Sequence, residues 1–194
     1  RKLNYTILYL KEQYVDGLNN EWVYENSDTA TGQVGTTVYA ANVPKLSSAP
    51  QGHALSDAMN GTATAGGNGE NTAVTIAADG SSVVMVYYSL IQYTIVFNIN
   101  LNSGVIVCNG QNYTGSNYTI TAVIGEDISD RYPLGDDRIY DTATGNNKQY
   151  FQNWDGTGEG GKTMRYELTF ANVQNANADH VVTYRSEERR VGKE

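Results

Sequence analysis

The triplet Tyr-Thr-Ile opens two β-like segments of this chain, the first at residues 5–7 and the second at residues 93–95. Each copy lies in a short run that is typical of a β-strand with one buried face. Just before the second copy, residues 83–88 follow an Asp-Gly turn signal and are rich in β-branched and aromatic side chains. A strand that closes one unit is therefore followed within a few residues by a strand that opens the next. This arrangement predicts tandem β modules.

The composition favours a secreted β protein and argues against two classes of partner. The 194 residues include 13 Lys and Arg against 21 Asp and Glu, a net charge of −8. Nucleic acids and anionic membranes both favour clustered basic residues, so we expect neither as a partner. Because no run approaches the roughly 20 apolar residues of a membrane span, we expect no membrane insertion. The single cysteine excludes an internal disulfide, which suits a bacterial cell surface.

The two ends of the chain lead to separate expectations. Residue 1 is Arg and no signal peptide is visible, so we expect an internal fragment. Seven of the last ten residues are charged, and residues 185–194 resemble the in-frame translation of a sequencing-library adapter. We interpret 185–194 as adapter-encoded, so that the natural protein continues past Tyr184.

We expect two units, at residues 1–90 and 91–184, that are mainly β or α+β. In the first unit the alternation predicts strands at 3–10 and 21–25, a loop at 28–35, and a closing hairpin formed by 73–77 and 83–88. Tyr87 and Tyr88 point to opposite faces of their strand. We therefore expect one in the core and the other at the junction between units.

In the second unit the pattern predicts strands, one short helix and a polar loop. The helix is expected at 126–132, where Pro133 stops it, and the loop covers 135–148. The strands are expected at 93–99, 104–108, 118–123, 150–154, 164–170 and 181–184.

Short motifs in both units resemble repeats of bacterial cell-wall-anchored surface proteins. The first unit resembles mucin-binding-protein repeats in residues 5–9, in residues 35–38 and in its ending, Asp79-Gly80 with Val86-Tyr87-Tyr88. The second resembles an internalin-type B-repeat, or the related Listeria–Bacteroides repeat, at residues 93–98, 125–129 and 151–154. The resemblance implies two tandem, small β-grasp-like modules, strung with adjacent repeats along an extracellular adhesin.

Residues for catalysis are sparse, and we expect no enzyme. Nucleophilic catalysis needs Ser or Cys beside a His and an orienting acid. His53 and His180 lie in different units, and Cys108 lies on an apolar strand that suits a buried side chain.

Two other kinds of chemistry remain open from the residues alone. Asp136, Asp137 and Asp141 are candidate calcium ligands together with backbone carbonyls, although solvated loop roles also explain them. Lys11 and Lys45 are candidates for an internal Lys–Asn crosslink, which requires an apolar pocket and a neighbouring acid.

Aromatic side chains are the best candidates for ligand binding. Trp22, Tyr24, Tyr150 and Trp154 lie on expected strands, where alternation buries some rings and exposes others. An exposed Tyr or Trp offers a broad apolar face with a polar group at its edge, which suits sugars and peptides. We expect no required cofactor, with calcium as the one candidate.

These expectations favour a non-enzymatic repeat region on a bacterial cell surface. It either binds a host glycan or protein or acts as a stalk that presents a distal binding domain. The alternative is an accessory carbohydrate-binding or spacer region of a larger secreted glycoside hydrolase.

Overall fold

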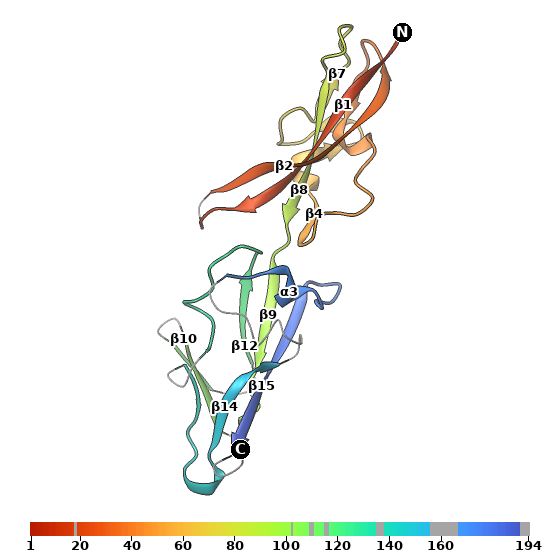
Figure 1. Cartoon of the computed structure of the whole chain (residues 1–194). Coiled ribbons are helices and arrows are strands. Elements are labelled where there is room, and N and C mark those ends of the chain that lie inside the picture. Colours follow the sequence, from red (N-terminus) through yellow and green to blue (C-terminus); the bar gives the residue numbers. More distant parts are fainter. Residues whose placement is uncertain are drawn as a thin grey trace. The chain divides into compact units, whose positions relative to one another are not determined.

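The chain is divided into two compact units, each with its own sheet. The computed structural model describes residues 1–17, 19–101, 103–108, 111–114, 117–134, 138–155 and 167–190, apart from the side chains of Arg189 and Arg190. The units are Arg1–Ile91 and Gln92–Glu194. Both are built mainly from strands (Figure 1), so the mainly β class is confirmed.

The first unit is organised around a four-stranded mixed sheet. Its strands are β1 (Lys2–Tyr14), β2 (Asn20–Gln33), β8 (Val83–Leu90) and β4 (His53–Leu55), in the order β2-β1-β8-β4. The first and last strands of the unit, β1 and β8, are parallel neighbours, whereas β2 and β4 are antiparallel to them. The remaining elements are short: β3 (Thr37–Tyr39), η1 (Ala40–Asn42), α1 (Asp57–Asn60), β5 (Gly61–Thr62), β6 (Ala65–Gly66) and β7 (Ala73–Thr75).

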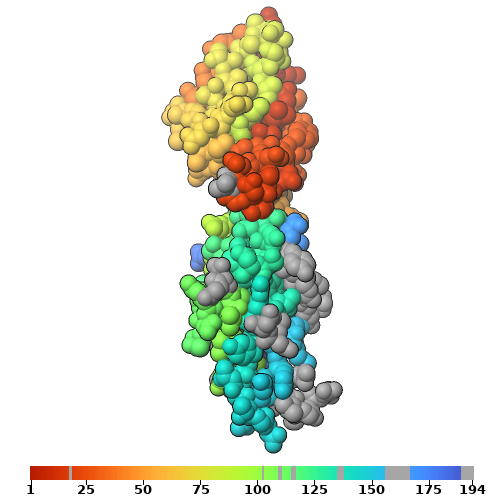
Figure 2. Space-filling view, turned by 90° about the vertical axis from the view of Figure 1, so that its left-hand side faces the viewer, coloured from red at the N-terminus to blue at the C-terminus, as the bar shows by residue number. Residues whose placement is uncertain are grey.

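One face of this sheet carries the core of the first unit. Side chains on alternate positions of β1 are buried, and alternate side chains of β8 pack beside them, as the two-residue period requires. The core comprises Tyr5, Ile7, Tyr9, Ala40, Val43, Ile76, Val84, Val86 and Tyr88. In Figure 2, the β1–β2 hairpin (red to orange) and the segment around residues 45–70 (yellow) form much of the visible surface of this unit.

The structure corrects three expectations for the first unit. The stretch 28–35 is not simply a loop, because β2 pairs with β1 as far as Gln33. β7 and β8 form no hairpin, because β7 pairs with β3 and β8 pairs with β1 and β4. Tyr87 and Tyr88 are both buried, since the segment that includes Gly69 covers the second face of β8 within the same unit.

The second unit contains a four-stranded mixed sheet and a smaller three-stranded sheet. The larger sheet has the order β12-β9-β15-β14, from β9 (Tyr93–Asn98), β12 (Asn117–Ala122), β14 (Gln149–Asp155) and β15 (Val181–Arg190). The smaller has the order β11-β10-β13, from β10 (Gly104–Cys108), β11 (Gln111–Thr114) and β13 (Ile139–Asp141). Two single-turn helices complete the described part, η2 (Gly145–Asn147) and α3 (Phe170–Val173).

The core of the second unit is centred on the ring of Phe97. Phe97 is fully buried and packs edge-on against Trp154 at 4.9 Å and against Tyr184 at 5.7 Å between ring centroids. The rings of Tyr118 and Tyr132 complete the cluster. Aromatic pairs at these separations stabilise a core beyond their buried area.

Three expectations for the second unit need correction. Residues 126–132 form turns instead of a helix, with the amides of Arg131 and Tyr132 both donating to the carbonyl of Ile128. The expected loop contains β13, and the expected strand at 164–170 ends differently, because Phe170 begins α3. Residues 164–166 lie outside the described residues.

The two large sheets share one topology. In each sheet, the first strand of the unit lies between the next strand of that sheet, which is antiparallel to it, and the parallel last strand. Thr6 of the first Tyr-Thr-Ile lies opposite Val83, and Thr94 of the second lies opposite Val181, where each closing strand begins. These two copies of the triplet therefore occupy equivalent places in two sheets. The closer β-grasp likeness stays a prediction, since the described α-helices are single turns.

The charged residues near the end continue β15. Arg185 to Arg190 pair with β14 in antiparallel register, from Asp155 back to Gln149. The interpretation of 185–194 as adapter-encoded stays a prediction.

Candidate functional site

A β-bulge in the first unit places two aromatic side chains on the second face of its sheet. Tyr9 lies opposite Asn26, but the next residue, Leu10, lies opposite Tyr24, so Glu25 is the extra residue of β2. A bulge reverses the faces to which the following side chains point. Without it, Tyr24 would share the core face with Asn26. The bulge therefore turns Tyr24, and Trp22 two residues before it, away from the core.

The resulting surface, here called the aromatic face, consists of Trp22, Tyr24, Leu10 and Tyr87. Tyr24, Leu10 and Tyr87 lie in one row across β2, β1 and β8. The Trp22 ring meets the Tyr87 ring edge-on at 5.1 Å between centroids. The hydroxyl of Tyr87 donates to the carbonyl of Glu70 at 2.8 Å, and this hydrogen bond holds the ring in place.

Exposure differs among the rings of the aromatic face. Tyr24 is 62% exposed, and its hydroxyl lies 3.3 Å from that of Ser27. Trp22 is partly exposed and Tyr87 is buried. Burial raises the pKa of the Tyr87 hydroxyl. Trp22 and Tyr24 thus form a pair of rings, supported by Tyr87, that is accessible to a flat ligand such as a sugar ring.

In the second unit another bulge separates the other two predicted rings. Phe151 lies opposite Glu188 and Asn153 lies opposite Glu187, so Gln152 is the extra residue of β14. Tyr150 and Trp154 consequently point to opposite faces. Trp154 is completely buried, and its indole N–H donates to the carbonyl of Pro133 at 2.7 Å. Its expected role in binding is therefore wrong, because no ligand reaches the ring.

Tyr150 lines a groove between β13 and β14. The groove has a volume of about 420 Å³ and is lined by Ile139, Tyr140, Asp141, Lys148, Gln149, Tyr150 and Phe151. The ammonium of Lys148 lies 5.6 Å from the centre of the Tyr150 ring, within cation–π range. Sequence reasoning missed Tyr140 because it treated 135–148 as a loop, and it placed Phe151 on a strand without making it a binding candidate. The apolar pair Ile139-Tyr140 was the only local signal of a strand there.

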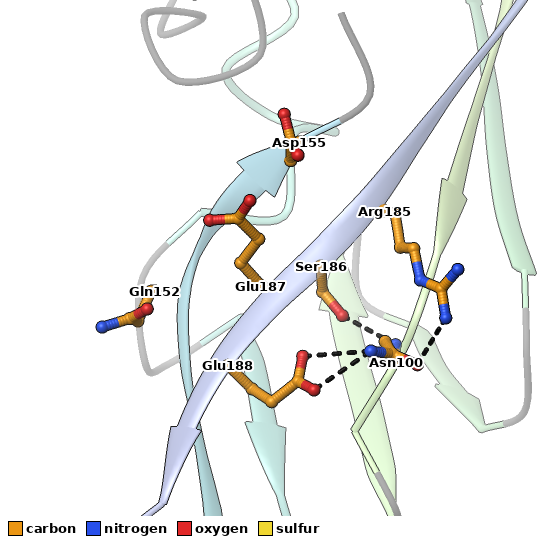
Figure 3. Close-up of a pocket in the computed structure, with 7 residues that line it drawn as sticks. All are labelled: Asn100, Gln152, Asp155, Arg185, Ser186, Glu187 and Glu188. Carbon is orange, nitrogen blue, oxygen red and sulfur yellow. Dashed lines mark hydrogen bonds between the residues drawn. The ribbon is translucent and has the colours of Figure 1, made fainter. Parts of the chain in front are cut away.

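A second pocket, about 360 Å³ in volume, lies along β15 (Figure 3). Asn100 is its centre: its backbone N–H donates to Ser186 Oγ at 2.7 Å, and its side-chain amide donates to Glu188 Oε1 at 3.0 Å. Arg185 donates to the side-chain oxygen of Asn100 at 3.2 Å. Four of the seven lining residues fall within 185–194, which resembles adapter sequence. We therefore assign this pocket no function.

The candidate calcium ligands are only partly described. Asp136 and Asp137 lie outside the described residues. Asp141 is buried, and its two oxygens accept the backbone N–H groups of Ala143 at 3.0 Å and Gln149 at 2.9 Å. It therefore fixes the β13–β14 connection. Among the residues that the structure describes, no three His, Cys, Asp or Glu side chains form a metal-binding group.

Cys108, His53 and His180, the residues considered for nucleophilic catalysis, are either buried or held by packing and backbone contacts. Cys108 is buried on β10. The two ring nitrogens of His53 lie 2.9 Å from the Gln51 carbonyl and 2.7 Å from the Glu12 carbonyl. The ring of His180 packs edge-on against Tyr93.

Both lysines that are candidates for a Lys–Asn crosslink contact carboxylate or backbone carbonyl oxygens. Lys11 forms an ion pair with Glu25 at 2.8 Å. The ammonium of Lys45 donates to the carbonyls of Ala41 and Val43, while burial lowers the pKa of Lys45. The Lys–Asn crosslink stays a prediction.

Within the described ranges, the chain contains no helix with the length and apolar character needed to cross a bilayer. Comparison with protein-family models finds no matching family, and comparison with curated proteins finds no significantly similar sequence.

Proposed function

We propose that this chain is a non-enzymatic extracellular repeat region of a bacterial cell-wall surface protein. The observation that carries the proposal is the shared topology of its two units, each with parallel first and last strands. A chain folded in this way enters a unit at one end of the sheet and leaves at the other. Such units can be joined in long series, as surface arrays require.

The proposal assigns adhesion to the aromatic face of the first unit. Trp22 and Tyr24 offer neighbouring rings on one side of β2, and a host glycan or an extended peptide is the ligand class that suits them. One such contact is weak, but repeated units multiply it through avidity. If the face binds nothing, the units act as a stalk for a distal domain.

Binding of a panel of mucin-type and cell-surface glycans by the full chain tests this assignment. Tyr24→Ala removes an exposed ring and is expected to weaken glycan binding by about tenfold or more, since one stacked ring contributes ~1–2 kcal/mol. Tyr24→Phe keeps the ring and serves as the matched control. Binding that is unchanged in Tyr24→Ala excludes the aromatic face, and no binding to any glycan or host protein favours the stalk.

The second candidate is an accessory carbohydrate-binding or spacer region of a secreted glycoside hydrolase. The groove of the second unit favours it, because Tyr140, Tyr150 and Phe151 offer aromatic edges to a polysaccharide. Binding to insoluble plant or microbial polysaccharide that Tyr150→Ala abolishes supports this candidate. The complete reading frame separates the two: a cell-wall sorting signal with further repeats supports the adhesin, and a hydrolase domain supports the alternative.

A further inference from the structure

We infer that each unit is a tension-resisting module, in which the parallel pair of first and last strands is the element that holds under force. The inference deepens the proposed function, because a cell-surface array transmits pulling forces along its chain. Its test is mechanical and needs no ligand, so it succeeds or fails independently of adhesion.

The direction of loading follows from the register of β1 and β8. Residues 6–11 of β1 lie opposite residues 83–88 of β8 in parallel. The chain enters at the start of β1 and leaves at the end of β8, so the two attachment points lie at opposite ends of the pair (Figure 1). Tension on the chain therefore slides the strands past each other along their axis. All the hydrogen bonds between them are loaded together instead of one after another.

Side chains fasten this pair where β8 leaves the sheet. Glu12, near the end of β1, accepts the backbone N–H of Leu90 on its Oε1 at 2.8 Å. Asn60 forms two hydrogen bonds with the backbone of Tyr87: its amide donates to the carbonyl at 2.9 Å, and its Oδ1 accepts the N–H at 2.8 Å. Sliding of β8 breaks these contacts together with the ladder.

Burial on the core face protects the same pair from water. Ile7, Val84 and Val86 have no exposed surface, and Tyr9 is 2% exposed. Backbone hydrogen bonds beside such side chains cannot readily exchange for bonds to water as they stretch, which raises the cost of breaking them.

The second unit repeats the arrangement with different residues. Residues 94–98 of β9 lie opposite residues 181–185 of β15 in parallel, and the Thr94 N–H donates to the carbonyl of His180 at 2.9 Å. Phe97 and Tyr184, opposite each other in this register, are both fully buried. Two unlike units thus keep the feature that resists sliding.

Single-molecule pulling on the full chain in two directions tests the inference. Cysteine handles at Arg1 and Gln92, with Cys108→Ala, load the first unit in shear. Handles at Arg1 and Ser81 in the same background pull on adjacent ends of β1 and β8 and peel them apart. Both handle pairs use exposed positions. At one constant force, shear is expected to give at least a tenfold longer lifetime, equivalent to ~1.4 kcal/mol in the barrier.

Complete unfolding in shear should lengthen the tether by about 30 nm, as expected for a unit that ends at Ile91. Equal lifetimes in the two directions, or a shorter lifetime in shear, overturn the inference for this unit. The second unit gives an independent comparison, with handles at Gln92 and Arg185 for shear and at Gln92 and Asp179 for peeling. Direction-independent lifetimes there overturn it for the second unit.

Discussion

The backbone at Gly69 packs so closely against the ring of Tyr87 that there is no room for a side chain at this position. A Cβ at this position would overlap the Tyr87 ring and lie 2.7 Å from its Cζ. The ring cannot move aside easily, because its hydroxyl donates to the Glu70 carbonyl and the ring packs against Trp22. Gly69→Ala is therefore expected to lower the free energy of unfolding by about 1–3 kcal/mol, measured by urea denaturation.

Gly17→Ala is the matched control for this overpacking. A Cβ at Gly17 meets nothing within 4 Å, so a change within about 0.5 kcal/mol is expected. A Gly69→Ala chain as stable as the Gly17→Ala chain contradicts the close approach to Tyr87.

The side chain of Asn60 forms hydrogen bonds with the backbone N–H and carbonyl of Tyr87 in β8. It is 2% exposed, so removing its amide leaves the buried N–H of Tyr87 without its acceptor, whereas the Tyr87 carbonyl keeps the N–H of Ser56 as a donor. Asn60→Ala is expected to lower the free energy of unfolding by about 1–3 kcal/mol, again by urea denaturation.

Asn42 provides the comparison for Asn60, because its amide makes one exposed hydrogen bond to the carbonyl of Ala63. Asn42→Ala should cost less than about 1 kcal/mol. If the two variants prove equally stable, the double contact of Asn60 with Tyr87 contributes nothing to stability.

At the scale of elements, β2 is an edge strand whose outward N–H groups are covered by its own side chains. The Thr6 N–H donates to the carbonyl of Ser82, just before β8, so Thr6 and, two residues on, Leu8 point their N–H groups away from β2. Their partners Thr29 and Ser27 correspondingly point their own N–H groups outward. A free edge of this kind is a template for pairing with another chain.

Asn26 and Asp28 block that template. Each Oδ1 accepts the N–H of the following residue at 2.8 Å, Asn26 from Ser27 and Asp28 from Thr29. Replacing both with Val frees two N–H groups and is expected to strengthen self-association about 30-fold, at about 1 kcal/mol per hydrogen bond. Light scattering across a concentration series measures it. The Ser27→Val/Thr29→Val double variant is the control, because it adds similar apolar area but keeps the Asn26 and Asp28 side chains that accept the two N–H groups. Equal association of the two double variants excludes edge protection.

The opening strands of both units were predictable from apolar residues at alternate positions, and the closing strands from short runs of β-branched and aromatic residues. The sequence could not predict that the first and last strands lie side by side in parallel, which depends on contacts between distant segments. Much of β2 is polar, from Asn26 to Gln33, and its strand form comes from pairing with β1 and not from its own propensity.

The candidate site was predictable only in part, for a related reason. Alternation placed Trp22 and Tyr24 on one face of a strand, but only the bulge at Glu25 determines which face. The bulge at Gln152 likewise separates buried Trp154 from Tyr150. Bulges arise from the register of two paired strands, which a single strand's sequence does not contain.

At the scale of the whole molecule, both units bury tyrosines that must stay uncharged. Burial raises the pKa of each member of this group above its usual value, most strongly for Tyr118, and the group comprises Tyr5, Tyr9, Tyr87, Tyr88, Tyr93 and Tyr118. An unfolded tyrosine ionises near pH 10, whereas the folded one retains its proton to higher pH. The unfolded state therefore binds fewer protons than the folded state above about pH 10.

Stability is accordingly expected to be intact below about pH 10 and to fall as the pH rises through the folded-state pKa values. The measurement is an alkaline titration that follows tyrosinate absorbance and circular dichroism together. The buried tyrosines should ionise late and in step with loss of β structure. The same titration in concentrated urea is the control, where all fifteen tyrosines should ionise in one transition near pH 10. Late ionisation without loss of β structure would show that the folded units tolerate tyrosinate, and early ionisation of every tyrosine would show that the rings are not buried.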